Sequence, residues 1–271
     1  MDSCSSRTRS LWQPSRYSTP SRALARANSR TENRELRLAA SAATRSTCTA
    51  QNGVVIFPFL PFAIVSLVHL WALFVSNAPV EHLTKPMLMP ALLLGFLIAL
   101  PERRSRIALL GALGILLSWA GDVLLGDPGG IGFILGLSAF LLAHVVFIVL
   151  FLGALRTHRM PWAALVLALW LAALIAILAP NLGSLLVPVI VYGLVLGIFA
   201  AAGLGTTPLV AVGAALVLVS DSVLALKMFL PGFSLWEKDF LIMLAYLVGQ
   251  GLVAVGAITL VNRRRAERAA A

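Results

Sequence analysis

A series of long apolar runs, separated by short breaks, fills the chain between residues 54 and 262. About 20 apolar residues are the length that a helix needs to cross the hydrocarbon core of a bilayer. Hydrophobic residues make up 59% of the 271 residues and the mean hydropathy is +0.93, which is more apolar surface than a soluble core of this size needs. The sequence therefore predicts an all-α protein, a polytopic bundle of membrane-spanning helices.

Eight apolar segments can be drawn, and Pro, Gly and Asn residues separate them. The predicted membrane helices cover residues 54–78, 84–100, 107–125, 131–155, 161–179, 183–203, 208–230 and 238–262. Arginines gather after the second, fourth and eighth segments, whereas the connections after the third and fifth hold no Lys or Arg. The positive-inside rule then places both termini in the cytoplasm, which requires an even number of helices.

Composition divides the chain into three parts. Residues 1–52 carry nine Arg and three acidic residues, lack apolar periodicity, and are predicted to be a disordered basic tail. Residues 53–262 form the membrane domain, and residues 263–271 a basic cytoplasmic tail. The first part also resembles an organelle transit segment. The excess of Arg over Lys, with abundant Ala, Leu and Val, instead favours a bacterial cytoplasmic membrane, and either a genuine tail or an upstream start. Nucleic acid is not an expected partner, because aromatic residues do not interleave the basic ones.

The two halves of the membrane domain look related. The second and sixth segments each place a Pro five residues before a Gly, and the third and seventh each carry an aspartate. Residues 139–144 of the fourth segment align without gaps to residues 245–250 of the eighth. The nearly constant offsets of 98, 99 and 106 residues predict a parallel duplication of four helices plus four. The alternative is a chance alignment among Ala, Leu and Gly residues.

Two aspartates, Asp122 and Asp221, lie inside predicted membrane helices, where a carboxylate costs several kcal/mol unless it faces protein or water. The other acids of the membrane domain fall in connections or at helix ends: Glu81, Glu102, Asp127, Glu237 and Asp239. Two carboxyl groups in one apolar site do not readily ionise together, so we expect an acid/base pair with one protonated and one ionised member. Alternatively, each aspartate bonds a neighbouring helix or pairs with Lys85 or Lys227.

Further polar residues fall at depths from which they can reach these aspartates. The candidates for substrate binding or support are Lys85, His144, Ser118, Ser220, Tyr192, Tyr246 and Gln250. His144 can orient or protonate a substrate, or simply bond a carbonyl across a helix interface. Lys85 precedes a proline and is expected to end a connection, where it holds a lipid phosphate or snorkels to the surface. His69 has no polar companions in its segment and is expected to pack at a helix interface, and Lys227 is expected to snorkel.

Several kinds of catalytic site are not expected in the membrane domain. Both cysteines, Cys4 and Cys48, lie in the N-terminal tail, so the membrane domain has no thiolate nucleophile or ligand. The chain lacks a G-x-S-x-G elbow, a Walker loop and an H-E-x-x-H motif. A zinc hydrolase needs at least three protein ligands, which this set of residues can barely supply. We therefore expect neither a metal nor another cofactor.

Five short motifs occur in order at suitable spacing. They are Lys85-Pro86, Ser118-Trp119-Ala120-Gly121-Asp122, Phe133-x-x-Gly136-x-x-x-Phe140-x-x-Ala143-His144, Ser220-Asp221, and Tyr246 with Gln250. This set resembles the YhhN-like lysoplasmalogenase family over about residues 54–262. The resemblance implies an eight-helix membrane protein that hydrolyses the vinyl ether of lysoplasmalogens. It also implies that Asp122 and Asp221 form the catalytic acidic pair, with His144 and Lys85 as site residues. One departure is Phe147, where the family pattern leads us to expect a tyrosine.

Vinyl ether hydrolysis suits these residues independently of the resemblance. It needs a carboxylic acid that protonates carbon and a carboxylate that stabilises the resulting cation and deprotonates water, with no nucleophilic Ser or Cys. We therefore expect a membrane hydrolase that acts on a single-chain ether phospholipid. The alternatives are a transporter or ion-coupled carrier that uses the intramembrane aspartates, and a non-enzymatic lipid-binding or assembly protein. The sequence leaves the oligomeric state open.

Overall fold

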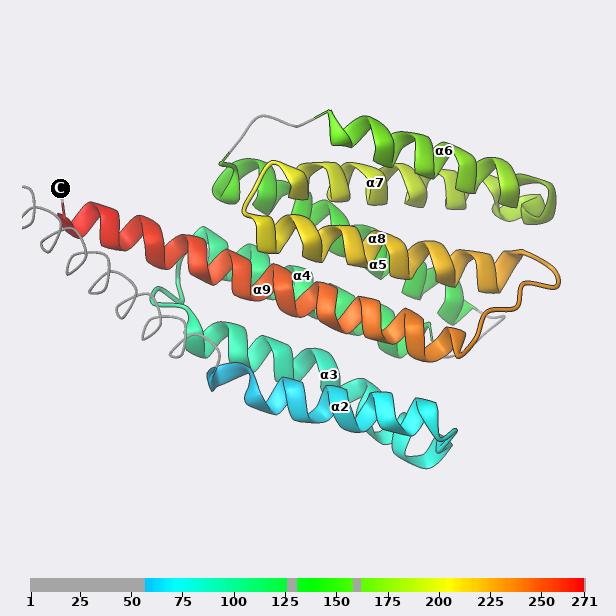
Figure 1. Cartoon of the computed structure of the whole chain (residues 1–271), viewed down its shortest axis with the longest axis horizontal. Helices are drawn as coiled ribbons and strands as arrows, with labels where there is room; N and C mark the ends of the chain where they lie inside the picture. The colour runs from blue at the N-terminus through cyan, green and yellow to red at the C-terminus, as the bar shows by residue number, and fades with distance from the viewer. Residues whose placement is uncertain (1–56, 126–130, 158–161, 271) are drawn as a thin grey trace, which may run out of the picture. The chain divides into compact units, whose positions relative to one another are not determined.

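The computed structural model describes residues 57–125, 131–157 and 162–270, and every regular element in them is a helix. The predicted disordered tail and Asp127 lie outside these residues. In chain order the elements are η1 (Phe57–Phe59), α2 (Leu60–Phe74), α3 (Ala78–Ala99), α4 (Arg106–Leu124), α5 (Ile131–Leu150), the π-helical turn η2 (Phe151–Leu155), α6 (Ala163–Leu182), η3 (Gly183–Leu185), α7 (Leu186–Leu204), α8 (Pro208–Phe229) and α9 (Lys238–Ala270). The long helices that follow one another along the chain run in opposite directions (Figure 1). The prediction of an all-α bundle is confirmed.

Seven helical runs among the described residues are long and apolar enough to cross a membrane. The longest covers residues 163–204 and holds 42 residues, so as one straight helix it would be about twice as long as the hydrocarbon core is thick. Gly183, with a φ of 50°, breaks this run, and α6 and α7 pack back along one another (Figure 1). The described residues therefore make eight crossings, and the chain is an integral membrane protein. Its sidedness stays a prediction.

The helix that carries Lys85 begins earlier than the sequence predicts. Its first residue is Ala78, because the side chain of Asn77 accepts a hydrogen bond of 3.3 Å from a main-chain N–H of the first turn, and Pro79 occupies one of the first two positions. Pro86 consequently lies inside α3 rather than at its start. The prediction that Lys85 ends a connection is wrong, and the lysine lies inside the helix, about two turns from its start.

Two helix pairs, α4 with α5 and α8 with α9, share the most extensive contacts in the bundle. Their backbones touch at glycines. A Cβ atom on Gly136 of α5 would lie 2.8 Å from the main-chain N of Leu125 at the end of α4, and one on Gly249 of α9 would lie 2.9 Å from the carbonyl O of Gly213 in α8. These pairs occupy equivalent positions in the two predicted halves, although the duplication itself stays a prediction. The close approach fixes how the aspartate helices α4 and α8 face their neighbours.

A cluster of phenylalanines fills the bundle on the side of the arginine-rich helix ends. The rings of Phe147 and Phe151 stack with centroids 6.0 Å apart, and Phe199 of α7 lies 5.4 Å from Phe151. All three side chains are buried. These rings fill the interior of the bundle between its arginine-rich end and the buried His144, which packs against Phe199.

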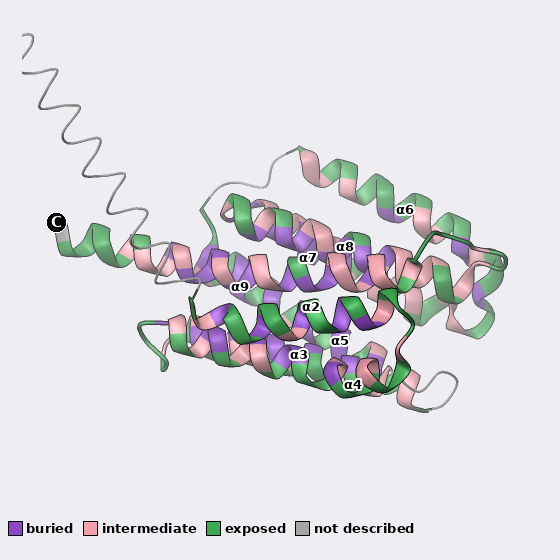
Figure 2. Ribbon diagram, turned by 60° about the horizontal axis from the view of Figure 1, so that its bottom comes forward, coloured by how far each residue is buried: buried purple, intermediate pink, exposed green. Residues whose placement is uncertain are grey.

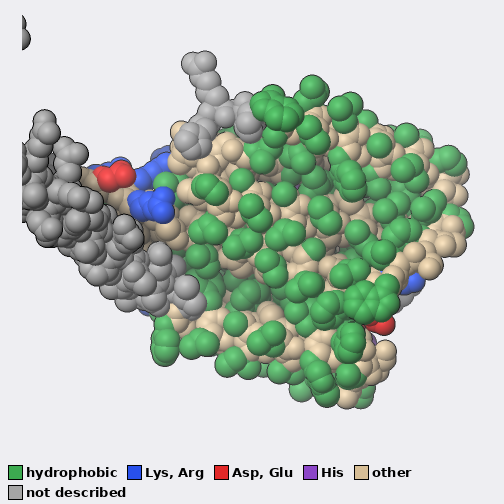
Figure 3. Space-filling view, in the orientation of Figure 1, with side chains coloured by type: hydrophobic (Ala, Val, Ile, Leu, Met, Phe, Trp, Pro, Cys, Tyr) green, Lys and Arg blue, Asp and Glu red, His purple; other side chains and the backbone are tan. Residues whose placement is uncertain are grey.

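The outward faces of the helices are apolar. Figure 3 shows one face of the molecule covered by hydrophobic side chains, with charged side chains visible near its two ends. Helix α6 packs on α7 and α8 and exposes much of its surface (Figure 2). Trp170 of this helix is exposed, and so is Trp162, which immediately precedes it. At the other end of the chain the last turns of α9 extend past its neighbours. There Arg264 donates to the carbonyl oxygens of Ala154 and Arg156, which lie at the end of η2.

Candidate active site

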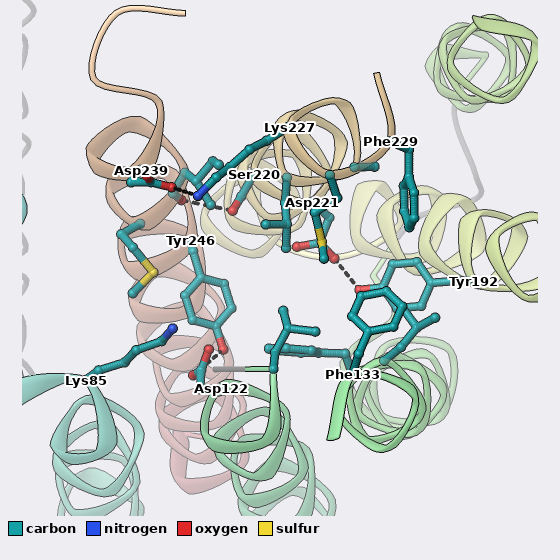
Figure 4. Close-up of a pocket in the computed structure, with 18 of the residues that line it drawn as sticks. Lys85, Asp122, Phe133, Tyr192, Ser220, Asp221, Lys227, Phe229, Asp239 and Tyr246 are labelled. Carbon is teal, nitrogen blue, oxygen red and sulfur yellow. Dashed lines mark hydrogen bonds and ion pairs between the residues drawn. The ribbon is translucent and has the colours of Figure 1, made fainter. Parts of the chain in front are cut away.

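A cavity of about 610 Å³ lies at the end of the bundle opposite to the arginine-rich end. Side chains from α2, α3, α4, α5, α7, α8 and α9 line it, so both halves of the membrane domain contribute to its walls. Its volume falls within the range of ordinary ligand pockets. Both Asp122 and Asp221 line this cavity (Figure 4). The structure thus brings the two acids, from helices that are far apart in sequence, into one shared space.

Asp122 lies about 24 Å along α4 and is buried. The hydroxyl of Tyr246, on α9, donates to its Oδ2 atom over 3.0 Å. Gly121 lets this part of α4 approach α5, because a Cβ atom there would lie 2.6 Å from the ring of Phe140. The Phe140 ring in turn packs edge-on against Tyr246, with centroids 6.2 Å apart. The carboxyl group is therefore held by a tyrosine that is itself fixed by an aromatic contact.

Asp221 has the corresponding place on α8, about 20 Å along the helix. Its Oδ2 atom accepts a hydrogen bond of 2.5 Å from the hydroxyl of Tyr192 on α7. The Nε2 atom of His144, on α5, lies 3.9 Å from the same oxygen, and the imidazole packs against the rings of Tyr192 and Phe199. The Asp221 side chain is 12% exposed, in contrast to 5% for His144. Each aspartate thus has its own tyrosine donor, and Asp221 also has a histidine close to its carboxyl group.

The predicted supporting residues separate into two groups. Those that line the cavity together with the aspartates are Lys85, Tyr192, Ser220 and Tyr246. His144, Ser118 and Gln250 are buried outside the cavity lining. Gln250 donates to the Ser118 hydroxyl at a long distance of 3.5 Å, which joins α9 to α4 one turn below Asp122. Ser220 donates to the carbonyl of Ile242 on α9 over 2.9 Å, rather than to a carboxylate.

Two lysines reach the cavity and differ in their partners. Lys227, which the sequence suggested would snorkel, forms an ion pair with Asp239 that joins the end of α8 to the start of α9. Lys85 points towards Asp122 and Tyr246 (Figure 4). Among residues 57–125, 131–157 and 162–270 it has no ion-pair or hydrogen-bond partner. Lys85 is therefore the cation of the cavity that is available to an anionic group.

His69 is a cavity residue that the sequence did not identify. It packs between α2 and α3, as predicted, but its Nδ1 atom lies 2.8 Å from the hydroxyl of Thr84 on α3. Because that hydroxyl donates to the carbonyl of Val80 over 2.7 Å, its oxygen accepts the proton of Nδ1. The Nε2 atom of His69 has no partner among the described residues. The only sign of this contact in the sequence is that two polar residues, His69 and Thr84, lie 15 positions apart, one on each side of the connection between α2 and α3.

A hydrogen bond connects two of the short motifs to one another. Pro90 has no N–H group, so the carbonyl of Pro86, four residues earlier in α3, lacks its helical partner. The indole N–H of Trp119, on α4, donates to that carbonyl over 2.9 Å. This contact joins the helix that carries Lys85 to the helix that carries Asp122. It gives both motifs a structural role in addition to the polar residues they supply.

Phe147, the position where a tyrosine was expected, is buried and lies outside the lining of the large cavity. Its ring tip packs against Gly114, where a Cβ atom would lie 2.7 Å away. It borders instead a void of about 10 Å³ shared with Gln250. The absent hydroxyl therefore removes no group from the cavity that holds the aspartates.

The arrangement is suited to proton transfer in a confined apolar site. Two carboxyl groups, each with a tyrosine donor, face one another across a space whose other walls are largely apolar. Within the described residues no cluster of three or more His, Cys, Asp or Glu side chains is placed to hold a metal ion. One carboxyl group can give a proton to a substrate and the other can take one from water. These are the requirements of general acid/base hydrolysis.

Comparison with known proteins identifies the family. Neither the search of the curated proteins nor that of the solved structures gave a match. A model of the YhhN family matches residues 80–257 of the 271 residues, which takes in α4 to α8 and most of α3 and α9. This span holds Lys85, both aspartates and both tyrosine donors. On the strength of this match the chain belongs to the YhhN family.

Proposed function

We propose that this protein is a membrane hydrolase that cleaves the vinyl ether bond of a lysoplasmalogen-like, single-chain ether phospholipid. The products are a fatty aldehyde and a glycerophospho-alcohol. The observation that carries the proposal is the shared cavity, in which Asp122 and Asp221 each accept a hydrogen bond from a tyrosine. The chain belongs to the YhhN family, and the resemblance of its five motifs to the lysoplasmalogenases of that family supports the same reaction.

The reaction follows from the chemistry of an enol ether. A carboxylic acid protonates the vinyl carbon remote from the oxygen, and the other vinyl carbon becomes part of an oxocarbenium ion. Water adds to that ion, and the resulting hemiacetal collapses to the aldehyde and the alcohol. A nearby carboxylate stabilises the cation and accepts the proton of water. Two carboxyl groups are therefore sufficient, and in this proposal the ammonium of Lys85, which lines the same cavity, binds the phosphate of the head group.

The walls of the cavity agree with a lipid substrate. Apolar residues of α5, α7 and α8 form one side of it, including Phe133, Val189 and Leu224. Lipid chains bind to such surfaces through the hydrophobic effect, at roughly 0.8 kcal/mol per buried methylene group. In this proposal the single-chain lipid enters the cavity from the bilayer that surrounds the bundle.

A carrier remains the second candidate, because acids inside the membrane are also typical of transporters. The cavity, however, occupies one end of the bundle, and the buried rings of Phe147, Phe151 and Phe199 fill the space below it. A carrier of this structure would have to separate those rings and the glycine contacts between α8 and α9 to expose the site to the other face. The hydrolase requires no such rearrangement.

The proposal is tested with purified full-length protein in detergent and three lysolipids that differ only in the bond to the chain. We expect aldehyde release from the vinyl ether, and no cleavage of the saturated ether or the ester. Cleavage of the ester alone would contradict the proposed chemistry. Absence of turnover, together with proton or solute flux in proteoliposomes, would replace the hydrolase by the carrier.

A further inference from the structure

The cavity has two unlike sides, and the two aspartates lie on different ones. The charged side is formed by Glu81 and Lys85 of α3, with His69 of α2. The apolar side is formed by Phe133 of α5 and Phe229 of α8, whose rings touch edge-on with centroids 6.3 Å apart, together with Val189 of α7. In Figure 4, Asp122 and Tyr246 lie towards Lys85, whereas Asp221 and Tyr192 lie towards Phe133 and Phe229.

This asymmetry orients a single-chain ether phospholipid in one direction. Its phosphate is attracted to the ammonium of Lys85, and its alkyl chain to the apolar side formed by Phe133 and Phe229. The vinyl ether, which links head group to chain, then lies between the aspartates. The vinyl carbon that must be protonated belongs to the chain and faces Asp221. The carbon bonded to the ether oxygen belongs to the head-group side and faces Asp122.

From this orientation, and resting on the function proposed above, we propose that Asp221 is the proton donor and Asp122 is the carboxylate that is ionised at the start of the turnover. The charges around the two groups agree with the assignment. Asp122 faces the cation Lys85 from α3, Tyr246 from α9 and Asp221 from α8. Asp221 faces Tyr192 from α7, His144 from α5 and Asp122 from α4.

The nearest other lysine does not alter this picture. Lys227, on the same helix as Asp221, is paired with Asp239 of α9. With Lys227 paired, Asp221 faces no unpaired lysine or arginine among the described residues, and its basic neighbour is His144, whose ring packs against Tyr192 and Phe199. A positive charge beside one of two carboxyl groups in the same cavity favours ionisation of that group, so a proton carried by only one of them resides on the other. The proton is therefore held on the chain side of the cavity, where the reaction needs it.

The proton balance closes over one turnover. Asp221 gives its proton to the vinyl carbon of the chain and becomes a carboxylate. Water adds to the oxocarbenium carbon and passes a proton to Asp122. When the hemiacetal collapses, its hydroxyl proton moves to Asp221, the bond from carbon to the glyceryl oxygen breaks, and that oxygen takes the proton from Asp122. Both side chains return to their starting states, and the sum is ether plus water giving aldehyde plus alcohol.

The assignment is tested by the pH dependence of kcat/KM, corrected for the acid-catalysed hydrolysis of the lipid without enzyme. The wild type should give a bell-shaped profile, with an acidic limb from the group that must be ionised and an alkaline limb from the group that must be protonated. The residual activity of Asp122→Asn should lose the acidic limb, and that of Asp221→Asn should lose the alkaline limb. Glu102→Gln, which changes an exposed acid at the opposite end of the bundle, should keep both limbs.

Loss of the alkaline limb in Asp122→Asn and of the acidic limb in Asp221→Asn would overturn the assignment. Retention of both limbs by either variant would also overturn it. A wild type without vinyl ether cleavage would instead refute the proposed function itself.

If both variants are too slow for a pH profile to be measured, a binding measurement tests the assignment instead. A lysolipid in which a protonated secondary amine replaces the ether oxygen imitates the cation. The quantity compared is the affinity for this amine divided by the affinity for its uncharged ether analogue. This ratio should be at least about 30-fold lower for Asp122→Asn than for the wild type, and close to the wild-type ratio for Asp221→Asn. The reverse order of affinities would refute the assignment.

Discussion

Replacement of Tyr192 by phenylalanine removes one hydroxyl and tests whether the hydrogen bond to Asp221 serves the reaction. The hydroxyl donates to Oδ2 of Asp221 over 2.5 Å, and it is the donor that the structure gives to this carboxyl group. When the acid gives up its proton, the bond must stabilise a carboxylate in an apolar cavity. A hydrogen bond to a charged group contributes about 1.5–3 kcal/mol, so kcat should fall roughly 10- to 150-fold.

The variant should fold normally, because the aromatic ring stays. The Tyr192 ring packs edge-on against His144 with centroids 5.7 Å apart, and phenylalanine preserves that contact. Aldehyde release from vinyl ether lysolipid, followed by a coupled aldehyde dehydrogenase, gives kcat and KM, and thermal unfolding in detergent reports stability. A kcat within twofold of the wild type would refute the reasoning. A large loss of thermal stability would show that the Tyr192 hydroxyl stabilises the folded protein rather than the ionised form of Asp221.

Three further changes test the structure around the site. Gly249→Ala should lower the unfolding midpoint in detergent and cost about 1–3 kcal/mol of stability, because the backbones of α8 and α9 must separate. Its control is Gly153→Ala, which should leave the midpoint unchanged because nothing lies within 4 Å of the Cβ position of Gly153. Lys85→Met should raise KM for a lysolipid that carries a phosphate, with little change in KM for a chain without one; equal effects on both would exclude a phosphate contact. Trp119→Phe leaves the carbonyl of Pro86 unpaired and should destabilise the bundle by about 1–3 kcal/mol, and an unchanged midpoint would contradict this.

The helices were predictable from the sequence because hydropathy and breaks report them directly. Eight crossings follow from the apolar runs, although Pro180-Asn181, where the sequence predicts the break between α6 and α7, lie in the last turn of α6 and the chain turns at Gly183. The helix start before Lys85 was missed because Pro86 looks like an N-terminal proline, whereas Asn77 and Pro79 supply the actual signal. A proline inside a helix is tolerated here because another helix satisfies a carbonyl that Pro90 leaves free.

The acids of the candidate site were predictable, and so were several residues of its lining, but the contacts among them were not. Asp122 and Asp221 are conspicuous because acids inside membrane helices are costly. Hydropathy does not give the rotation of each helix, so the tyrosine donors could be named as candidates but not paired with an aspartate. The contacts of His69 with Thr84, and of Lys227 with Asp239, join different helices and leave no periodic trace in the sequence. They had to come from the packing of the bundle.

The central claim is that two carboxyl groups from separate helices perform one reaction in one cavity. It is tested most directly by aldehyde release from vinyl ether lysolipid by the wild type, Asp122→Asn and Asp221→Asn, with Glu102→Gln as the control at the far end of the bundle. The account predicts that each asparagine variant, folded and still able to bind lipid, loses at least about 100-fold in kcat, while the control keeps its activity. Full activity in either asparagine variant would contradict it.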